Sequence, residues 1–137
     1  MPFEYGIPGP KRADVERVRA IYDAFARRDA DAAVEHLAPD AELWLTGTAQ
    51  RVGRTGPYVG HEGMREYLAD VNRAWQELEL VADDIRAAGD GVVVFGHVRG
   101  RVDGTPVARR AVWVWRLRDG QAISVRVTDM GPLDPEG

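Results

Sequence analysis

Apolar residues recur at helical spacing in three segments in the first half of the chain. Residues 14–28 predict one helix and residues 61–76 predict another. Between them, Asp29 or Asp31 starts a short helix that Pro39 ends, because the residue before a proline avoids helical geometry. The apolar faces carry Val15, Val18, Ile21, Tyr22 and Phe25 in the first helix, Val34 and Leu37 in the second, and Met64, Tyr67, Leu68, Val71 and Trp75 in the third.

The remaining segments alternate between apolar and polar residues, which is typical of strands that are half-buried in a sheet. Residues 41–46 predict a first strand, and residues 78–86 and 92–102 predict two more. Residues 47–60 form a long glycine-rich connection, and connections of this length are more often functional rims or lids than simple turns. Residues 106–130 contain two β-branched and aromatic runs on either side of Asp-Gly, which is a strong signal for a β-hairpin.

The turn of this hairpin decides which side chains share a face, since a slip of one residue exchanges the two faces of a strand. A two-residue turn of Asp119 and Gly120 would set Trp113 beside Arg126. A three-residue loop that includes Arg118, with Gly120 in a left-handed bulge position, separates apolar from polar side chains, and we therefore predict this loop. It pairs Trp115 with Ile123, Trp113 with Val125, Ala111 with Val127 and Arg109 with Asp129.

The order helix, helix, strand, helix and four-strand meander predicts an α+β domain in which three helices pack against one twisted sheet. A chain of 137 residues is long enough for one such domain with a hydrophobic core. We place the domain at residues 14–131. Residues 1–13 are rich in proline and glycine and predict an extended arm, and residues 132–137 are expected to form a tail.

The composition argues against several classes of function. A net charge of −4 lacks the basic footprint of a nucleic-acid-binding domain. The absence of cysteine excludes disulfides, thiolate zinc sites and a cysteine nucleophile, and the three scattered histidines do not form a spaced metal-binding pair. No segment resembles a membrane span or a signal peptide. We therefore expect a cytoplasmic protein without metal or organic cofactor that binds neither nucleic acid nor membranes.

Four short motifs occur in an order that is specific in combination. They are Tyr-Asp-Ala-Phe-Ala-Arg-Arg-Asp-Ala-Asp, Leu-Ala-Pro-Asp-Ala-Glu, Tyr-Val-Gly-His-Glu-Gly-Met-Arg and Trp-Arg-Leu-Arg-Asp-Gly. With them the chain resembles, from Val15 to about Asp129, the SnoaL-like proteins of the nuclear transport factor 2 and ketosteroid isomerase superfamily. The resemblance implies a cone-shaped, curved mixed sheet wrapped around the helices, an apolar pocket between them, and a homodimer. Members include isomerases, polyketide cyclases, dehydratases, epoxide hydrolases and proteins without known activity, so the fold does not choose a function.

The resemblance also implies catalytic residues at positions that this chain fills differently. The isomerases use a general-base aspartate near the end of the first strand, where this chain has Leu45 and Thr46. Their oxyanion-donor aspartate on the fourth strand, a histidine in many cyclases, corresponds to Trp113. The last-strand aspartate of the cyclases and epoxide hydrolases corresponds to Val127, and the isomerase tyrosine aligns with Ile21, one position from Tyr22. The inherited catalytic set is therefore missing.

Three polar residues remain as catalytic candidates: Asp129, Tyr22 and Arg109. Apolar surface beside Asp129 would raise the pKa of its carboxyl, which suits a general acid or base, whereas Arg109 opposite would hold it ionised in a strand-end salt bridge. The hydroxyl of Tyr22 could donate to a ligand oxygen, or the ring could simply pack beneath the sheet.

Trp113 and Trp115 could form a stacking wall for a flat ligand or belong to the core, and in a fold that builds its pocket from its core both can hold. The residues that we expect to contact a small hydrophobic ligand are Trp113, Trp115, Phe25, Tyr58, Leu45, Val127 and Met64. Three hypotheses follow. The first is a cofactor-independent isomerase, cyclase or hydratase that acts on a hydrophobic cyclic substrate by acid–base chemistry. The second is a non-catalytic binder of an apolar ligand, and the third is a structural dimerisation module.

Overall fold

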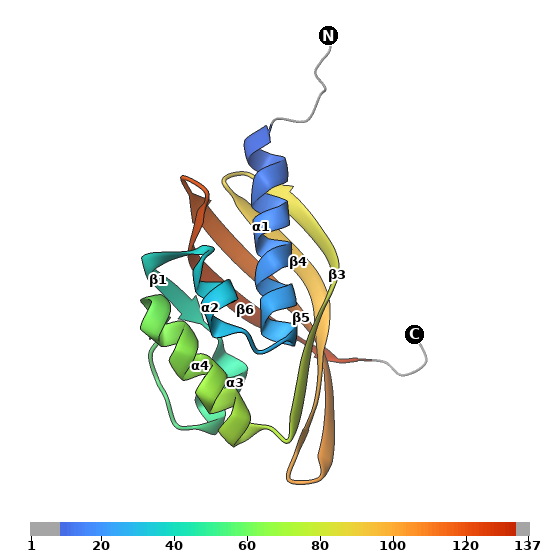
Figure 1. Ribbon diagram of the computed structural model, residues 1–137. Helices are drawn as coiled ribbons and strands as arrows, with labels where there is room; N and C mark the ends of the chain where they lie inside the picture. The colour runs from blue at the N-terminus through green and yellow to red at the C-terminus, as the bar shows by residue number, and fades with distance from the viewer. Residues whose placement is uncertain (1–8, 134–137) are drawn as a thin grey trace.

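The computed structural model describes residues 9–133, which form four helices and six strands (Figure 1). Their order along the chain agrees with the predicted α+β class, with one short helix and one short strand added. The elements are α1 (Gly9–Ala26), α2 (Ala30–Val34), β1 (Leu37–Trp44), α3 (Thr46–Arg51), β2 (Tyr58–Val59), α4 (Gly60–Ala74), β3 (Glu77–Ala88), β4 (Gly91–Val102), β5 (Thr105–Arg118) and β6 (Gln121–Pro132).

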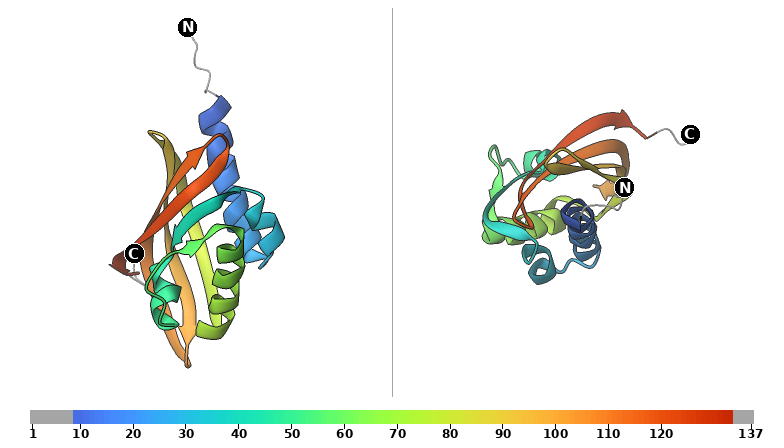
Figure 2. Two further views of the ribbon diagram at one scale, coloured as in Figure 1. Left: turned by 90° about the vertical axis from the view of Figure 1, so that its left-hand side faces the viewer. Right: turned by 90° about the horizontal axis from the view of Figure 1, so that it is seen from above.

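The six strands form one curved sheet in the order β2-β1-β6-β5-β4-β3. β3 to β6 are the predicted antiparallel meander, whereas β1 joins β6 in parallel, so the sheet is mixed. Seen from above, the sheet bends around α1 and α4, which lie on its concave side (Figure 2). This curved mixed sheet around helices confirms the predicted fold class. None of the helices within residues 9–133 combines the length and apolar character needed to cross a membrane.

Helix α1 begins at Gly9, so the part of the predicted extended arm that covers residues 9–13 is helical. The first turn of a helix tolerates a proline such as Pro10, because the N–H that proline lacks has no partner within the helix there. Residues 1–8 of the predicted arm and residues 134–137 of the predicted tail lie outside the described residues. The apolar face of α1 packs as expected, with Val18, Ile21 and Phe25 all buried against the sheet.

Asp29 is the N-cap of α2, since its Oδ1 accepts a hydrogen bond of 3.0 Å from the backbone N–H of Ala32. This helix is shorter than predicted, because Leu37 already belongs to β1. Pro39 therefore lies inside a strand. The pairing of β1 with β6 is irregular between Leu37 and Glu42, where a strand can accommodate a residue that has no N–H to donate.

The connection predicted at residues 47–60 contains α3 and the short strand β2, and it is fastened to the body of the domain. Thr48 and Ala49 in α3 are buried. The indole Nε1–H of Trp75, at the end of α4, donates a hydrogen bond of 3.0 Å to Oγ1 of Thr48. β2 pairs with β1 through Tyr58 and Val59. The segment thus forms a wall over one end of the sheet, held by packing and by a buried hydrogen bond.

The predicted three-residue loop in the β5–β6 hairpin is wrong. Asp119 (φ 53°) and Gly120 (φ 77°) both have left-handed backbone, and they form a two-residue turn that places Leu117 opposite Ala122. A bulge at Ile123 then shifts the register by one residue, so that Arg116 lies opposite Ser124. Beyond the bulge, Trp115 pairs with Val125, Trp113 with Val127 and Ala111 with Asp129.

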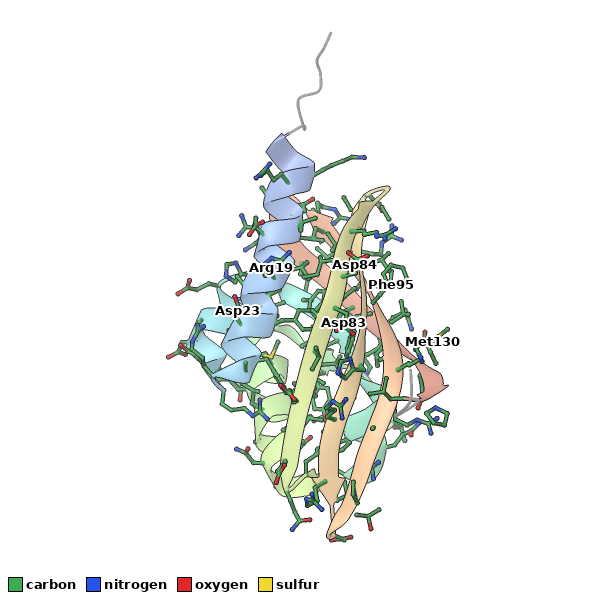
Figure 3. All side chains as sticks on the ribbon, turned by 90° about the vertical axis from the view of Figure 1, so that its right-hand side faces the viewer. Arg19, Asp23, Asp83, Asp84, Phe95 and Met130 are labelled. Carbon is green, nitrogen blue, oxygen red and sulfur yellow. The ribbon has the colours of Figure 1, made fainter. Side chains whose placement is uncertain are left out.

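The bulge explains why the predicted faces are nevertheless correct. With a two-residue turn alone, both tryptophans would lie on one face of the sheet and Val125 on the other. The extra residue in the bulge returns all three side chains to the same face. Trp113, Trp115 and Val125 are buried together on the concave face. Val114 on the other face is 44% exposed. Figure 3 shows Phe95, which is exposed to the same extent, on the outer surface of the sheet.

Candidate functional site

Three neighbouring cavities, which share lining residues, lie between the concave face of the sheet and the helices. The outer cavity, about 220 Å³, opens between α3 and the ends of β5 and β6. The middle cavity of about 60 Å³ shares Trp75, Val98 and Val127 with it, and the inner cavity of about 30 Å³ shares Leu45 and Trp113 with the middle one. Their volumes decrease from the edge of the sheet towards α1, and we refer to the three cavities together as the passage.

The inner and middle cavities are apolar. The inner cavity is lined by Ile21, Tyr22, Phe25, Leu43, Leu45, Met64, Tyr67, Trp113, Trp115 and Val125. The middle cavity adds Gly47, Thr48, Trp75, Leu78, Leu80, Val98 and Val127. No carboxylate or imidazole is among these residues, so their only side-chain polar atoms are hydroxyl oxygens and indole nitrogens.

The positions at which the resemblance implies catalytic acids all face these cavities. Leu45 and Trp113 line both the middle and the inner cavity, and Val127 lines the outer and middle ones. The backbone therefore presents these positions to the interior, but the side chains there cannot transfer a proton. Tryptophan at position 113, with only 2% of its surface exposed, also occupies much of the space that a ligand would need.

Asp129 lies at the edge of the outer cavity and forms a two-pronged ion pair with Arg109. Nε and Nη2 of Arg109 donate to the carboxylate oxygens over 3.0–3.2 Å, and the backbone N–H of Gly131 donates to Oδ1 over 2.7 Å. These hydrogen bonds, from Arg109 first and then from Gly131, lower the pKa of the Asp129 carboxyl below its usual value. The alternative of a raised pKa is thus wrong, and Asp129 is an ionised carboxylate and a weak base.

Tyr22 extends from α1 into the inner cavity and contacts both hairpin tryptophans. Its ring meets that of Trp113 edge to face at 5.5 Å, and its hydroxyl oxygen accepts a hydrogen bond of 3.2 Å from Nε1 of Trp115. Burial raises the pKa of the Tyr22 hydroxyl well above its usual value, against a smaller lowering by the bond from Trp115. The hydroxyl therefore keeps its proton and can donate it to a ligand oxygen.

Tyr58 does not line any of these cavities, unlike the other residues expected to contact a ligand. It is fully buried between β1 and α4, and its hydroxyl donates a hydrogen bond of 2.9 Å to Oδ2 of Asp70. Asp70 also accepts a hydrogen bond of 2.9 Å from Nη2 of Arg73, while the guanidinium of Arg54 lies over the Tyr58 ring. Through this hydrogen bond, Tyr58 attaches the wall formed by residues 47–60 to α4 without lining the cavities.

Sequence reasoning did not identify the residues that form the far side of the outer cavity. The guanidinium of Arg51, in α3, stacks on the ring of Trp75 at 4.6 Å from its centre. Gln50 and Val107 line the same cavity. The available signals were the length of the 47–60 connection and the position of Trp75 on the apolar face of the third helix. Neither signal indicates that Arg51 and Trp75 would meet.

The histidines take no part in the cavities. Nε2 of His61 lies 2.9 Å from the carbonyl oxygen of Leu37 and ties the start of α4 to β1. His97 lies on the outer face of the sheet, with Nδ1 2.8 Å from Oδ2 of Asp83. Within residues 9–133, no three His, Cys, Asp or Glu side chains come close enough together to hold a metal ion.

Solved structures of similar proteins share this architecture. One is an NTF2-like protein of unknown function from Burkholderia pseudomallei K96243, with 26% identity, a TM-score of 0.76, and coverage of 85% of this chain and 90% of that one. A second is TerC co-crystallized with polyporic acid, with 29% identity, a TM-score of 0.76, and coverage of 85% and 91%. A third, from Jannaschia sp. CCS1, is named as a SnoaL-like polyketide cyclase. It has 20% identity, a TM-score of 0.74, and coverage of 93% and 92%, and at this identity it shows the fold alone.

Sequence comparison gives the family directly. Among curated proteins, no sequence matches the chain significantly. The family model of the SnoaL-like domain, however, matches residues 18–125, which extend from the buried face of α1 to the hairpin valine beside Trp115. This range contains most of the residues that line the inner and middle cavities. The chain belongs to the SnoaL-like domain family.

Proposed function

We propose that the protein binds a small hydrophobic cyclic molecule in the passage formed by the three cavities, and that binding rather than turnover is its activity. The observation that supports this proposal most is the chemistry of the lining. Leu45, Trp113 and Val127 replace every acid that the family resemblance implies, and they do so with side chains that face the cavity. The interior can therefore bury an apolar ring but cannot ionise it.

Two further observations support binding. The aromatic side chains of Trp113, Trp115 and Tyr22 are held against one another, which provides a rigid wall for a flat molecule. TerC, which is similar to this chain in fold and sequence, was crystallised with polyporic acid. The outer cavity has the largest volume of the three, so a ring would enter the passage from there.

A matched pair of substitutions tests whether the passage is the binding site. Val127→Phe fills the junction of the outer and middle cavities, whereas Val114→Phe makes the same change on the exposed face of the adjacent strand. Binding of 2-naphthamide and of polyporic acid would be measured by calorimetry, and native mass spectrometry would detect a co-purifying molecule. We expect Val127→Phe to weaken binding at least about tenfold, as filling a binding pocket should, with no change for Val114→Phe. Equal behaviour of the two variants would exclude the passage as the site.

The same mass spectra report the oligomeric state. The family resemblance predicts a homodimer, and a monomer at working concentration would contradict that prediction. A homodimer without ligand in the cavity, and without affinity for either probe, would instead favour the hypothesis of a structural dimerisation module.

A second candidate function is acid–base catalysis with Asp129 as the base and Tyr22 as the hydrogen-bond donor. Its specific support is position: Asp129 lines the outer cavity two residues beyond Val127, and the Tyr22 hydroxyl keeps its proton at the inner end of the passage. The lowered pKa of Asp129 opposes it, because a carboxylate held ionised by Arg109 is a poor proton acceptor.

Proton exchange separates the two candidates. In deuterium oxide, a catalytic base would accelerate exchange of the protons next to the carbonyl of 2-tetralone, a bicyclic carbon acid, and NMR would follow the loss of their signals. The binding proposal expects no acceleration over buffer for the wild-type protein. Acceleration that disappears in Asp129→Asn, while affinity for 2-tetralone persists, would establish an enzyme instead.

A further inference from the structure

We infer that the molecule bound in the passage carries an anionic group, such as a carboxylate or an ionised enol, and that Arg51 and Arg109 hold this group at the outer cavity while the ring lies further in. The inference rests on the proposed binding function and adds the chemical class of the ligand. It follows from the distribution of charge along the passage. The inner and middle cavities contain no charged side chain, whereas the outer cavity is lined by Arg51, Arg109, Arg110 and Asp129.

The charged rim of the outer cavity is positive on balance. Arg109 and Asp129 neutralise each other in their ion pair. Within residues 9–133 no carboxylate forms an ion pair with Arg51, whose nearest described partner is the face of Trp75. Arg110 lines the same cavity and adds to this charge. A net positive charge therefore remains beside a cavity of about 220 Å³, next to low-dielectric apolar walls that strengthen its attraction for an anion.

Both guanidinium groups are held in place before a ligand arrives. Arg51 stacks on Trp75, and Trp75 is itself fixed by its hydrogen bond to Thr48. Arg109 is aligned by two-pronged contact with Asp129, which uses Nε and Nη2 and leaves Nη1 for another acceptor. A planar guanidinium that is already oriented loses little entropy when it binds a carboxylate or an enolate.

A cationic ligand would fit this rim poorly. Both oxygens of Asp129 already accept hydrogen bonds, Oδ1 from Arg109 and from the N–H of Gly131, and Oδ2 from Arg109. A ligand ammonium would have to displace these donors and would lie close to the charge of Arg51. The geometry thus favours an amphipathic molecule with its apolar ring inward and its negative end at the rim.

Two probes of nearly equal shape test the inference: 2-naphthoate, which is anionic at neutral pH, and 2-naphthamide, which is neutral. Their affinities would be measured by calorimetry for the wild-type protein and for Arg51→Gln. The matched control is Arg19→Gln, which removes the same charge from the exposed surface of α1 (Figure 3). Arg19 lines none of the three cavities. Circular dichroism and thermal melting would verify that each variant is folded.

We expect the wild-type protein to bind 2-naphthoate about tenfold more tightly than 2-naphthamide, as one charge-assisted contact at a half-exposed rim provides. Arg51→Gln should weaken binding of 2-naphthoate much more than binding of 2-naphthamide and so remove most of this preference, whereas Arg19→Gln should leave the preference intact. Equal affinity for the two probes, or equal losses in both variants, would overturn the inference and leave the binding proposal standing. Failure of both probes to bind the wild-type protein would remove the binding proposal as well.

Discussion

The hydrogen bond between Tyr58 and Asp70 should control how firmly the wall of the passage is attached. Tyr58→Phe removes only the hydroxyl that donates to Oδ2 of Asp70, and the ring keeps its edge contact with Tyr67, whose centre is 5.4 Å away. A hydrogen bond to a charged group contributes about 1.5–3 kcal/mol. Because Arg73 still neutralises the carboxylate, we expect a loss at the lower end, about 1.5 kcal/mol in the free energy of unfolding, or about 6 °C in melting temperature.

Asp70→Ala should cost more, about 3 kcal/mol, because it leaves the Tyr58 hydroxyl buried without an acceptor and separates Arg73 from its partner. The decisive measurement is the double variant. Once Asp70 is gone, Tyr58→Phe removes a hydroxyl that no longer has a partner, so the second substitution should be neutral or slightly stabilising. The two changes should therefore be non-additive by about 1.5 kcal/mol or more.

Urea unfolding followed by tryptophan fluorescence gives the four free energies, provided that the dependence on urea stays the same across the set. Asp90→Ala is the control, since it breaks the ion pair with Arg116 in which both side chains are more than half exposed, and it should cost less than about 0.5 kcal/mol. If Tyr58→Phe is equally costly with and without Asp70, the two side chains are not coupled, and the assignment of this hydrogen bond as the attachment of the wall is refuted.

Two further outcomes concern stability. Burial, as the largest cause, raises the pKa of the hydroxyls of Tyr22 and Tyr67, and raises that of Tyr58 to about 12, so the folded protein retains three protons that the unfolded chain loses above about pH 10. The free energy of unfolding should therefore be independent of these three groups below about pH 10 and should fall above it by up to about 4 kcal/mol per pH unit. Urea midpoints measured from about pH 9 to 11.5 test this expectation, and a flat profile would contradict it. Gly63→Ala should destabilise α4 by about 1–2 kcal/mol, because a Cβ there lies 2.7 Å from the carbonyl carbon of Tyr58 and this crowding outweighs the gain in helix propensity. Gly47→Ala in α3, where nothing lies within 4 Å of the added carbon, should instead raise the melting temperature, and the opposite order of the two variants would refute the packing argument.

Much of the fold can be predicted from the sequence because helical and strand periodicity are local properties. The spacing of Ile21, Phe25 and Met64 places them on buried helix faces, and all three line the inner cavity. Alternation along β5 places Trp113 and Trp115 on one face, and both are buried there. These predictions need only the direction in which neighbouring side chains point, which the backbone geometry of each element determines.

The residues of the candidate site could not all be predicted from the sequence, because contacts between elements decide which side chains come together. The bulge at Ile123 arises because a tight Asp-Gly turn and a segregated sheet face can be reconciled only by an extra residue, and local sequence does not show where that residue is inserted. Tyr58 was expected at the pocket but faces Asp70, since the direction of a short strand depends on its partner β1. The sequence alone thus determined which faces are apolar and that the inherited acids are missing. Only the tertiary structure brought Arg51 and Arg109 to one rim, because the closure of the α3 wall over the sheet is a long-range contact that no periodic pattern encodes.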